Sequence, residues 1–453
     1  MPTEPIDSCA ASSAAAAPRY HGYRFYNFRI WYGMLASAWL GLLVRNRFAV
    51  SPSRLPFALF GLLISAVNSI FNLVENLILA RRIRACVIEE PPIFIIGHWR
   101  TGTTFLHELL TLDERFTAPS TLECFAPAEC LLIRGLLRTL FKFALPAKRP
   151  MDNVLVGWDR PQEDEFALMN LGLRSPYEVI VFPNHRRAGH PFLNMTDLGP
   201  EQIEEWKAGF LSFLQKINLR SKYEQTDSKT LQCIVLKSPY HTARLPILRQ
   251  MFPAAKFIHI VRNPFEVFSS SIRLWRALFD TQGCQKPEFG ALGEDVPDLE
   301  QYVFDSMDLL YRDFFTQIAE IPVQNFCQVR YEDLVRAPVD EMARIYNHLQ
   351  FGSFETIRPR LEAYVRELDG YKTNKHHISP HQRAQIDQRW GWYMDRFGYR
   401  VPSAQARSDG FRAVNDECSF AVSQQKPATL AQGRTGSYIK LYTPGLQDVL
   451  CKK

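Results

Sequence analysis

The stretch PPIFIIGHWRTGTTFLHELL, residues 91–110, decides the fold class. Residues 93–96 form a short apolar run typical of a buried strand, and the leucines that follow Thr103 have the spacing of one face of a helix. The eight residues GHWRTGTT, 97–104, connect the two. A glycine-rich turn between a strand and a helix directs backbone N–H groups and the positive end of the helix dipole at one point. This stretch therefore predicts an anion-binding loop.

The loop departs from the phosphate-binding loop of nucleoside triphosphatases. That pattern ends in Gly-Lys-Ser/Thr, whereas Thr103 occupies the lysine position here. The basic residue is Arg100, which lies inside the loop and offers a bidentate cation, while Thr101, Thr103 and Thr104 offer hydroxyl donors. Gly97 and Gly102 allow the backbone to approach an oxyanion closely. These residue types favour a different phosphate chemistry.

A triphosphatase or kinase also needs an acidic residue at a strand end to hold magnesium. Neither IVLKSP, residues 234–239, nor FIHIVRNP, residues 257–264, supplies one. A P-loop-type kinase or triphosphatase is therefore the weaker alternative function.

The rest of the chain repeats the strand-then-helix pattern of the opening stretch. Three further runs are predicted strands: 233–236, 256–261 and 326–331. Each precedes a predicted helix, and Pro264 and Pro338 stand where the first helical residue of two of them is expected. This alternation predicts an α/β fold: a P-loop-like, three-layer domain with a parallel sheet between two layers of helices. In such folds ligands bind at the carboxyl ends of the strands.

Composition alone predicts the character of two further segments of this domain. Residues 135–230 are expected to be mostly helical, and residues 280–300, rich in glycine, proline and acidic residues, form a candidate lid.

Two hydrophobic stretches precede this domain, at 30–44 and 55–80, and predict a helical N-terminal hairpin. The second stretch carries four polar residues that share one helical face, namely Asn68, Asn72, Glu75 and Asn76. Arginines flank both ends, so the charge pattern gives no clear orientation in a membrane. Two interpretations stay open: a pair of helices that packs on the core or on a membrane surface, and a pair of true membrane spans.

The amino-acid composition indicates the kind of ligand and the order of the segments along the chain. The 453 residues are 46% apolar and carry a formal net charge of +6, which suits an anionic small molecule and argues against a dedicated nucleic-acid-binding surface. Nine cysteines are scattered without a CxxC pair or metal-ligand spacing, so we predict reduced thiols and no metal site. Residues 1–28 are predicted to be disordered, residues 29–88 to be helical and 401–453 to form a tail.

Four segments in the same order resemble the sulfotransferases that use 3′-phosphoadenosine-5′-phosphosulfate (PAPS), particularly the bacterial group related to the tyrosylprotein sulfotransferases. They are GHWRTGTTFLHELL (97–110), IVLKSPYHTARLPILRQMFPAAKFIHIVRNPFEVFSSSI (234–272), CQVRYEDLVRAP (327–338) and HHISPHQRAQIDQRWGWYMDRFGY (376–399). The resemblance makes residues 89–400 a sulfotransferase domain. It implies that PAPS is the donor, that adenosine 3′,5′-bisphosphate is the product and that no metal is required.

The resemblance also implies roles for individual residues. Arg100, Thr101, Gly102, Thr103 and Thr104 would hold the 5′-phosphosulfate. Arg262 and Ser270 would hold the 3′-phosphate, and Lys237 would stabilise the sulfuryl group in transfer. Sulfuryl transfer is similar to phosphoryl transfer, a loose in-line displacement in which positioning and charge stabilisation provide most of the catalysis.

The general base stays open among three alternatives. Glu123 follows the first helix, near the place where the tyrosylprotein group carries its glutamate base. Glu163, Asp164 and Glu165 form a dense acidic cluster in which neighbouring carboxylates could raise one another's pKa. A histidine is the third alternative: His98, His107 or His241.

The acceptor is predicted only by class, as a hydroxyl or amine on a small molecule, a lipid or a carbohydrate. The aromatic content of 13% permits an apolar acceptor. We expect a cytoplasmic protein, at the cytoplasmic face of the membrane if residues 30–80 associate with it. A non-catalytic, membrane-associated nucleotide-binding protein is a further alternative.

Overall fold

The structure is a computed structural model that describes residues 26–140, 145, 148–152, 154–185, 192–224, 232–288, 299–367 and 378–400. Most of the predicted N-terminal segment 1–28 lies outside these residues, as do the tail 401–453 and the centre of the candidate lid, 289–298.

The core of the molecule is a parallel sheet of five strands in the order β2-β3-β1-β4-β5. The strands are β1 (Ile93–Ile96), β2 (Phe116–Thr117), β3 (Cys233–Lys237), β4 (Lys256–Val261) and β5 (Phe326–Arg330). The four predicted strands are confirmed. The prediction missed β2, because two residues are too short to produce an alternating pattern.

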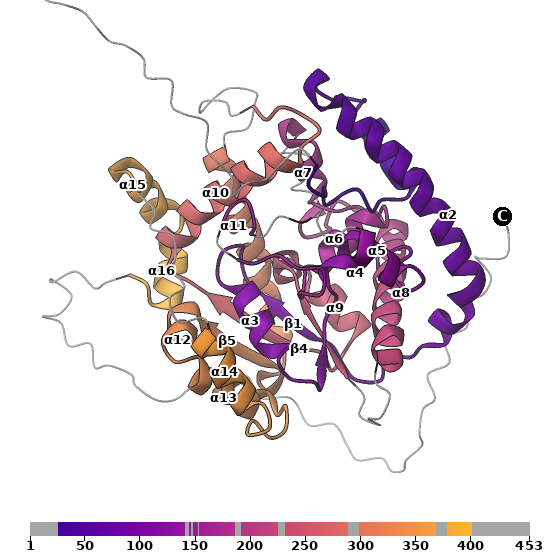
Figure 1. Ribbon diagram of the computed structural model, residues 1–453. Coiled ribbons are helices and arrows are strands. Elements are labelled where there is room, and N and C mark those ends of the chain that lie inside the picture. Colours follow the sequence, from indigo (N-terminus) through magenta and orange to yellow (C-terminus); the bar gives the residue numbers. More distant parts are fainter. Residues whose placement is uncertain are drawn as a thin grey trace, which may run out of the picture. The chain divides into compact units, whose positions relative to one another are not determined.

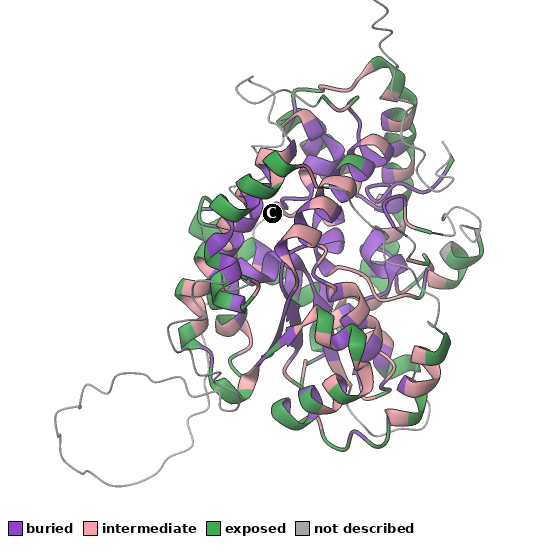
Figure 2. Cartoon of the chain, turned by 90° about the vertical axis from the view of Figure 1, so that its left-hand side faces the viewer, coloured by how far each residue is buried: buried purple, intermediate pink, exposed green. Residues whose placement is uncertain are grey.

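Alternate residues of each strand enter two separate cores. Ile93 and Ile95 of β1 pack on one side of the sheet, whereas Phe94 and Ile96 pack on the other. Every one of these four side chains is almost completely buried. Figure 2 shows the buried strands between the two helical layers. The near-continuous apolar runs of the sequence reflect a parallel sheet that is covered on both faces.

Helices cover both faces, as predicted (Figure 1). The smaller core is closed by α3 (Thr103–Leu110), α12 (Tyr331–Arg336), α13 (Pro338–Leu349) and α14 (Arg358–Glu367). The larger core includes residues of α4 (Thr121–Phe125), α6 (Asp164–Asn170), α7 (Glu178–Val181), α8 (Pro200–Glu224), α9 (Leu245–Met251), α10 (Pro264–Gln282), α11 (Leu299–Gln317), α15 (Pro380–Arg389) and α16 (Gly391–Phe397). The short helix α5 (Arg134–Leu140) follows α4.

The chain leaves two neighbouring strands, β1 and β4, toward opposite faces of the sheet. The helix after β1 is α3, which packs in the smaller core, whereas the helix after the neighbouring strand β4 is α10, which packs in the larger core. Such a divergence opens a crevice at the carboxyl ends of the strands, where α/β proteins bind ligands. The loop 97–102 follows β1 and therefore lies at this crevice.

The N-terminal hairpin consists of α1 (Ala36–Arg45) and α2 (Leu55–Ala85), which contact each other. Helix α2 also contacts α8 and runs along the edge of the domain in Figure 1. Trp31 and Trp39 stack with their ring centroids 4.5 Å apart. A Cβ atom on Gly61 of α2 would come within 2.6 Å of Trp31, so the close packing of α2 on this aromatic pair requires glycine at that position.

Candidate active site

The loop after β1 has an unusual backbone. Gly97, Arg100 and Gly102 have φ angles of 140°, 70° and 101°. A Cβ atom on Gly97 would lie 2.5 Å from the carbonyl oxygen of Ile260, and one on Gly102 would lie 2.2 Å from the ring of Tyr331. Only glycine fits at either position, so the loop can bring its backbone close to a ligand as the sequence predicts.

Helix α3 begins directly after this loop, at Thr103. Its first N–H groups have no partner within the helix and point toward the crevice, together with the positive end of the helix dipole. The hydroxyl of Thr101 donates to the carbonyl of His98 at 2.7 Å, so this side chain stabilises the loop itself. Thr103 and Thr104 line an adjoining cavity.

Three of the predicted donor-binding residues meet at the loop. Arg100 Nε donates to the hydroxyl of Ser270, on α10, at 2.7 Å. Arg262, which follows β4, donates from Nη1 to the carbonyl of Arg100 at 3.0 Å. Arg100 Nη1 also forms an ion pair of 2.6 Å with the buried Asp152. The guanidinium of Arg262 lies 4.3 Å from the ring centroid of Tyr331, the same ring that contacts Gly102. Arg100 is thus held by a serine hydroxyl and a carboxylate, and Arg262 by a backbone carbonyl and an aromatic ring.

The acidic cluster 163–165 meets a row of basic side chains that extends from the end of β3 to the residue before α9. The three pairs are Lys237 with Glu163 at 2.5 Å, His241 with Asp164 at 2.7 Å and Arg244 with Glu165 at 2.6 Å. Each carboxylate therefore has a basic partner of its own. Burial raises the pKa of Asp164, but the hydrogen-bonded His241 outweighs it, so the pKa lies below its usual value.

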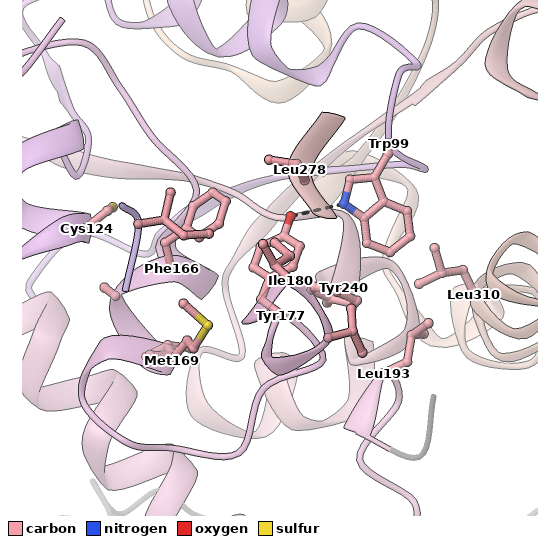
Figure 3. Close-up of a cluster of buried hydrophobic side chains, with 14 of the residues drawn as sticks. Trp99, Cys124, Phe166, Met169, Tyr177, Ile180, Leu193, Tyr240, Leu278 and Leu310 are labelled. Atoms are coloured by element: carbon pink, nitrogen blue, oxygen red, sulfur yellow. Dashed lines mark hydrogen bonds between the residues drawn. The ribbon is translucent and has the colours of Figure 1, made fainter. Parts of the chain in front are cut away.

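Glu163 differs from its two neighbours because it lines the cavity beside the loop. One carboxylate oxygen accepts from Lys237, and the other accepts a short hydrogen bond from the hydroxyl of Tyr177. Tyr177 in turn accepts from the indole N–H of Trp99 at 3.0 Å, the contact drawn in Figure 3. Burial raises the pKa of Tyr177 well above its ordinary value, so this hydroxyl keeps its proton and donates it. These contacts hold Glu163 as an oriented hydrogen-bond acceptor.

Lys237 lies behind Glu163 and not on the cavity wall. Its Cα pairs with that of Ile95 across β1 and β3, so the residue sits at the strand ends next to the loop. Burial lowers the pKa of Lys237, and the Glu163 carboxylate opposes this shift. The ion pair with Glu163 thus offsets part of the cost of burying the Lys237 ammonium.

The cavity has a volume of about 130 Å³. The polar residues of its lining include Arg100, Thr103, Thr104, Arg149, Gln162 and Glu163. The apolar residues include Phe28, Ile30, Phe125, Phe166, Leu274 and Leu278. Phe166 and Leu278 appear beside Tyr177 in Figure 3. A cavity with a few convergent polar groups on an apolar surface is typical of a small-molecule site.

The other candidates for the general base lie elsewhere. Glu123 is 1% exposed and forms a capping box with Ser120 at the start of α4. It also pairs with Arg220 at 3.0 Å, and it is not among the residues that line the cavity. His98, His107 and His241 are fully buried and do not line the cavity either. Burial lowers the pKa of His98 to about 4 and that of His107 to about 3, so both are neutral at physiological pH.

Several residues of the site were not found from the sequence. Trp99 stands inside the predicted loop, and Tyr331 is the last residue of a predicted strand, so the position of each in the sequence could have indicated a role. Tyr177 and Asp152 occur in stretches without a recognisable pattern, and only the fold brings them to Glu163 and Arg100.

The comparisons with known proteins identify the family of this chain. The model of a sulfotransferase family matches residues 91–355. The chain belongs to this family. The omega-hydroxy-beta-dihydromenaquinone-9 sulfotransferase Stf3 of Mycobacterium bovis is 39% identical to it over 384 residues, which are 85% of this chain and 95% of that protein. This sulfotransferase is thus a transferase, as the sequence predicts.

Two solved structures support the same fold. Sulfotransferase STF1 of Mycobacterium tuberculosis H37Rv superimposes with a TM-score of 0.55 at 19% identity, and covers 79% of this chain and 92% of its own. Sulfotransferase STF9 of Mycobacterium avium gives a TM-score of 0.54 at 17% identity, over 81% of this chain and 97% of its own. At these identities the likeness shows the fold alone.

Proposed function

We propose that this sulfotransferase transfers the sulfuryl group of PAPS to a hydroxyl at the end of a lipid chain. The observation that carries the proposal is the position of Glu163. Its carboxylate lines one cavity together with Arg100 of the loop and with several apolar side chains.

The donor would lie along the loop. The N–H groups at the start of α3, with the side chains of Arg100, Thr103 and Thr104, fit the 5′-phosphosulfate, because positive charge and donors converge there. Arg262 and Ser270, which already contact Arg100, fit the 3′-phosphate. PAPS supplies an activated sulfuryl group whose leaving phosphate gains negative charge. Arg100 and the helix N-terminus would stabilise that charge.

Glu163 would act as the general base that takes the proton of the acceptor hydroxyl. Its two hydrogen-bond donors, Lys237 and Tyr177, fix the carboxylate and leave it facing the cavity. A base must lie within hydrogen-bond reach of the proton that it removes, and among the three sequence candidates only Glu163 lines the space where an acceptor fits.

The apolar part of the cavity supports a lipid acceptor. Aromatic and aliphatic side chains from the N-terminal segment, α4, α6 and α10 would bind a hydrocarbon chain by burial of apolar surface. The Mycobacterium bovis relative is named for a menaquinone derivative with a terminal hydroxyl, a compound of this class. The reaction would take place at the cytoplasmic face of the membrane, the location expected from the sequence.

Titration calorimetry with two nucleotides tests the donor assignment. Adenosine 3′,5′-bisphosphate should bind without magnesium, whereas ATP with magnesium should bind at least about 100-fold more weakly, because Arg262 and Ser270 then have no 3′-phosphate to contact.

Arg262→Ala should weaken the binding of adenosine 3′,5′-bisphosphate by about 10- to 100-fold, since a charge-assisted pair is lost. Arg312→Ala, on an exposed arginine of α11, serves as the matched control. Equal affinity for the two nucleotides would instead favour a kinase or triphosphatase.

A further inference from the structure

Helix α2 has its polarity reversed relative to an ordinary surface helix. The residues that it buries against the domain are mostly small or polar, namely Ala58, Gly61, Ser65, Asn68, Glu75 and Ile83. The side that faces outward is apolar. A surface helix of a globular protein normally places its apolar stripe on the core and its polar residues in water.

The polar side of α2 is bound to the domain by specific contacts. Asn68 donates to the carbonyls of Tyr32 and Met34 at 2.8 and 3.1 Å. Glu75 pairs with Lys216 of α8 at 2.7 Å and also accepts the backbone N–H groups of residues 131 and 132. The polar residues that share one face in the sequence thus include two that fix the helix to the enzyme.

The outward side forms an apolar strip, because the exposed residues between Leu55 and Ile78 are all apolar except Asn76. Of 24 large hydrophobic side chains that are exposed in the described part of the chain, eleven belong to α2 between Leu55 and Ile78. The helix segment from Leu55 to Ile78 is about 35 Å long. The exposed fractions of Leu63, Ile70 and Leu77, which lie on one side of the helix, are 64, 63 and 77%. Exposed apolar surface of this extent marks an interaction site.

Basic residues stand at both ends of this strip. Arg47 precedes α2, and Arg81, Arg82 and Arg84 occupy its last turns, all with exposed side chains. A partner that fits must therefore be apolar in its interior and anionic at its surface. A phospholipid bilayer with anionic head groups has both properties.

We propose that the outward side of α2 binds flat on the surface of an anionic bilayer, with the helix axis in the plane of the membrane. The helix is long and apolar enough to cross a bilayer, with a mean hydropathy of 2.0 in its most apolar window, of which only 22% is buried. Its contacts with the domain, however, extend from Ala58 to Ile83. A spanning α2 would take the Glu75–Lys216 pair into hydrocarbon or break it, and either change is costly.

This inference goes beyond the proposed reaction, because vesicle binding requires neither donor nor acceptor. The full chain should bind vesicles of phosphatidylcholine and phosphatidylglycerol in a flotation assay, and should bind pure phosphatidylcholine more weakly. Ile70→Glu and Leu77→Glu should each lower the partition coefficient by about tenfold or more, since each removes the burial of one large apolar side chain. Val323→Glu and Val335→Glu, at exposed apolar positions outside α2, should leave binding unchanged.

Three outcomes would overturn the proposal. The first is a wild-type chain that binds no vesicles. The second is a dimer, measured by light scattering, that Ile70→Glu dissociates without any effect on vesicle binding, because a second copy would then cover the strip. The third is a bound chain that does not exchange to competing vesicles, which would indicate a spanning helix. Unchanged melting temperatures and unchanged binding of adenosine 3′,5′-bisphosphate verify that each variant is folded.

Discussion

Glu163→Gln is expected to lower kcat for sulfuryl transfer by about 10²- to 10⁴-fold. The amide has nearly the same size as the carboxylate but cannot take a proton from the acceptor hydroxyl. Its oxygen can still accept from Lys237 or Tyr177, so the cavity should keep its shape. Donor affinity, measured by calorimetry with adenosine 3′,5′-bisphosphate, should change by less than about threefold, because Glu163 faces the acceptor side of the loop.

Two matched variants separate the other candidate bases. Glu123→Gln weakens ion pairs with Arg220 and Arg134 and should lower the melting temperature, yet it should retain kcat within about fivefold. His241→Asn leaves Asp164 with a weaker partner and should likewise affect stability more than chemistry. One result would assign the general base to Glu123 or His241. In that result, the variant of that residue loses about 10²-fold or more in kcat, while Glu163→Gln stays within about tenfold of wild type.

Lys237→Met is expected to reduce kcat by about 10²- to 10³-fold, the effect typical of removing one preorganised cationic or hydrogen-bond donor from an active site. The buried ammonium both orients Glu163 and brings positive charge next to the loop. Methionine fills a similar volume without either property, so the packing beside β1 should remain.

The double variant Glu163→Gln/Lys237→Met distinguishes these two roles. If Lys237 acts only through Glu163, the double variant should be no slower than Glu163→Gln alone, because residues that act as a unit are not additive. A further loss of about tenfold or more would show that Lys237 also stabilises the transferring sulfuryl group directly. Wild-type kcat in Lys237→Met would contradict both roles.

The parts of the fold that follow from the sequence are those with strong local patterns. The strand, glycine loop and helix from Ile93 to Leu110 are predictable, because burial, positive φ angles and helical periodicity each restrict the residue types within a few positions. The strands at 233, 256 and 326 follow from the same pattern, and so do the helix starts at Pro264 and Pro338.

The parts of the fold and of the site that cannot be predicted from the sequence depend on contacts between residues far apart in the chain. The acidic triplet 163–165 has the composition of a solvated helix start, and only the tertiary fold brings Lys237, His241 and Arg244 against it. The same applies to Tyr177, which is 14 positions from Glu163 and 78 from Trp99. In α2, the polar face is visible in the sequence, but which side faces the domain is decided by groups such as Lys216 that lie more than 100 residues away.

Transfer of ³⁵S from labelled PAPS to a long-chain polyprenyl alcohol tests the central claim most directly. The alcohol and the same chain without its terminal hydroxyl are presented in vesicles of one composition, and the lipid fraction is then counted. We expect label in the alcohol only, dependent on wild-type enzyme and lost with Glu163→Gln. Label that appears only in a water-soluble phenol added as competitor, and never in the lipid alcohol, would contradict the proposed acceptor. Absence of transfer to every hydroxyl offered, by a wild-type enzyme that binds the donor product, would contradict the proposed sulfuryl transfer.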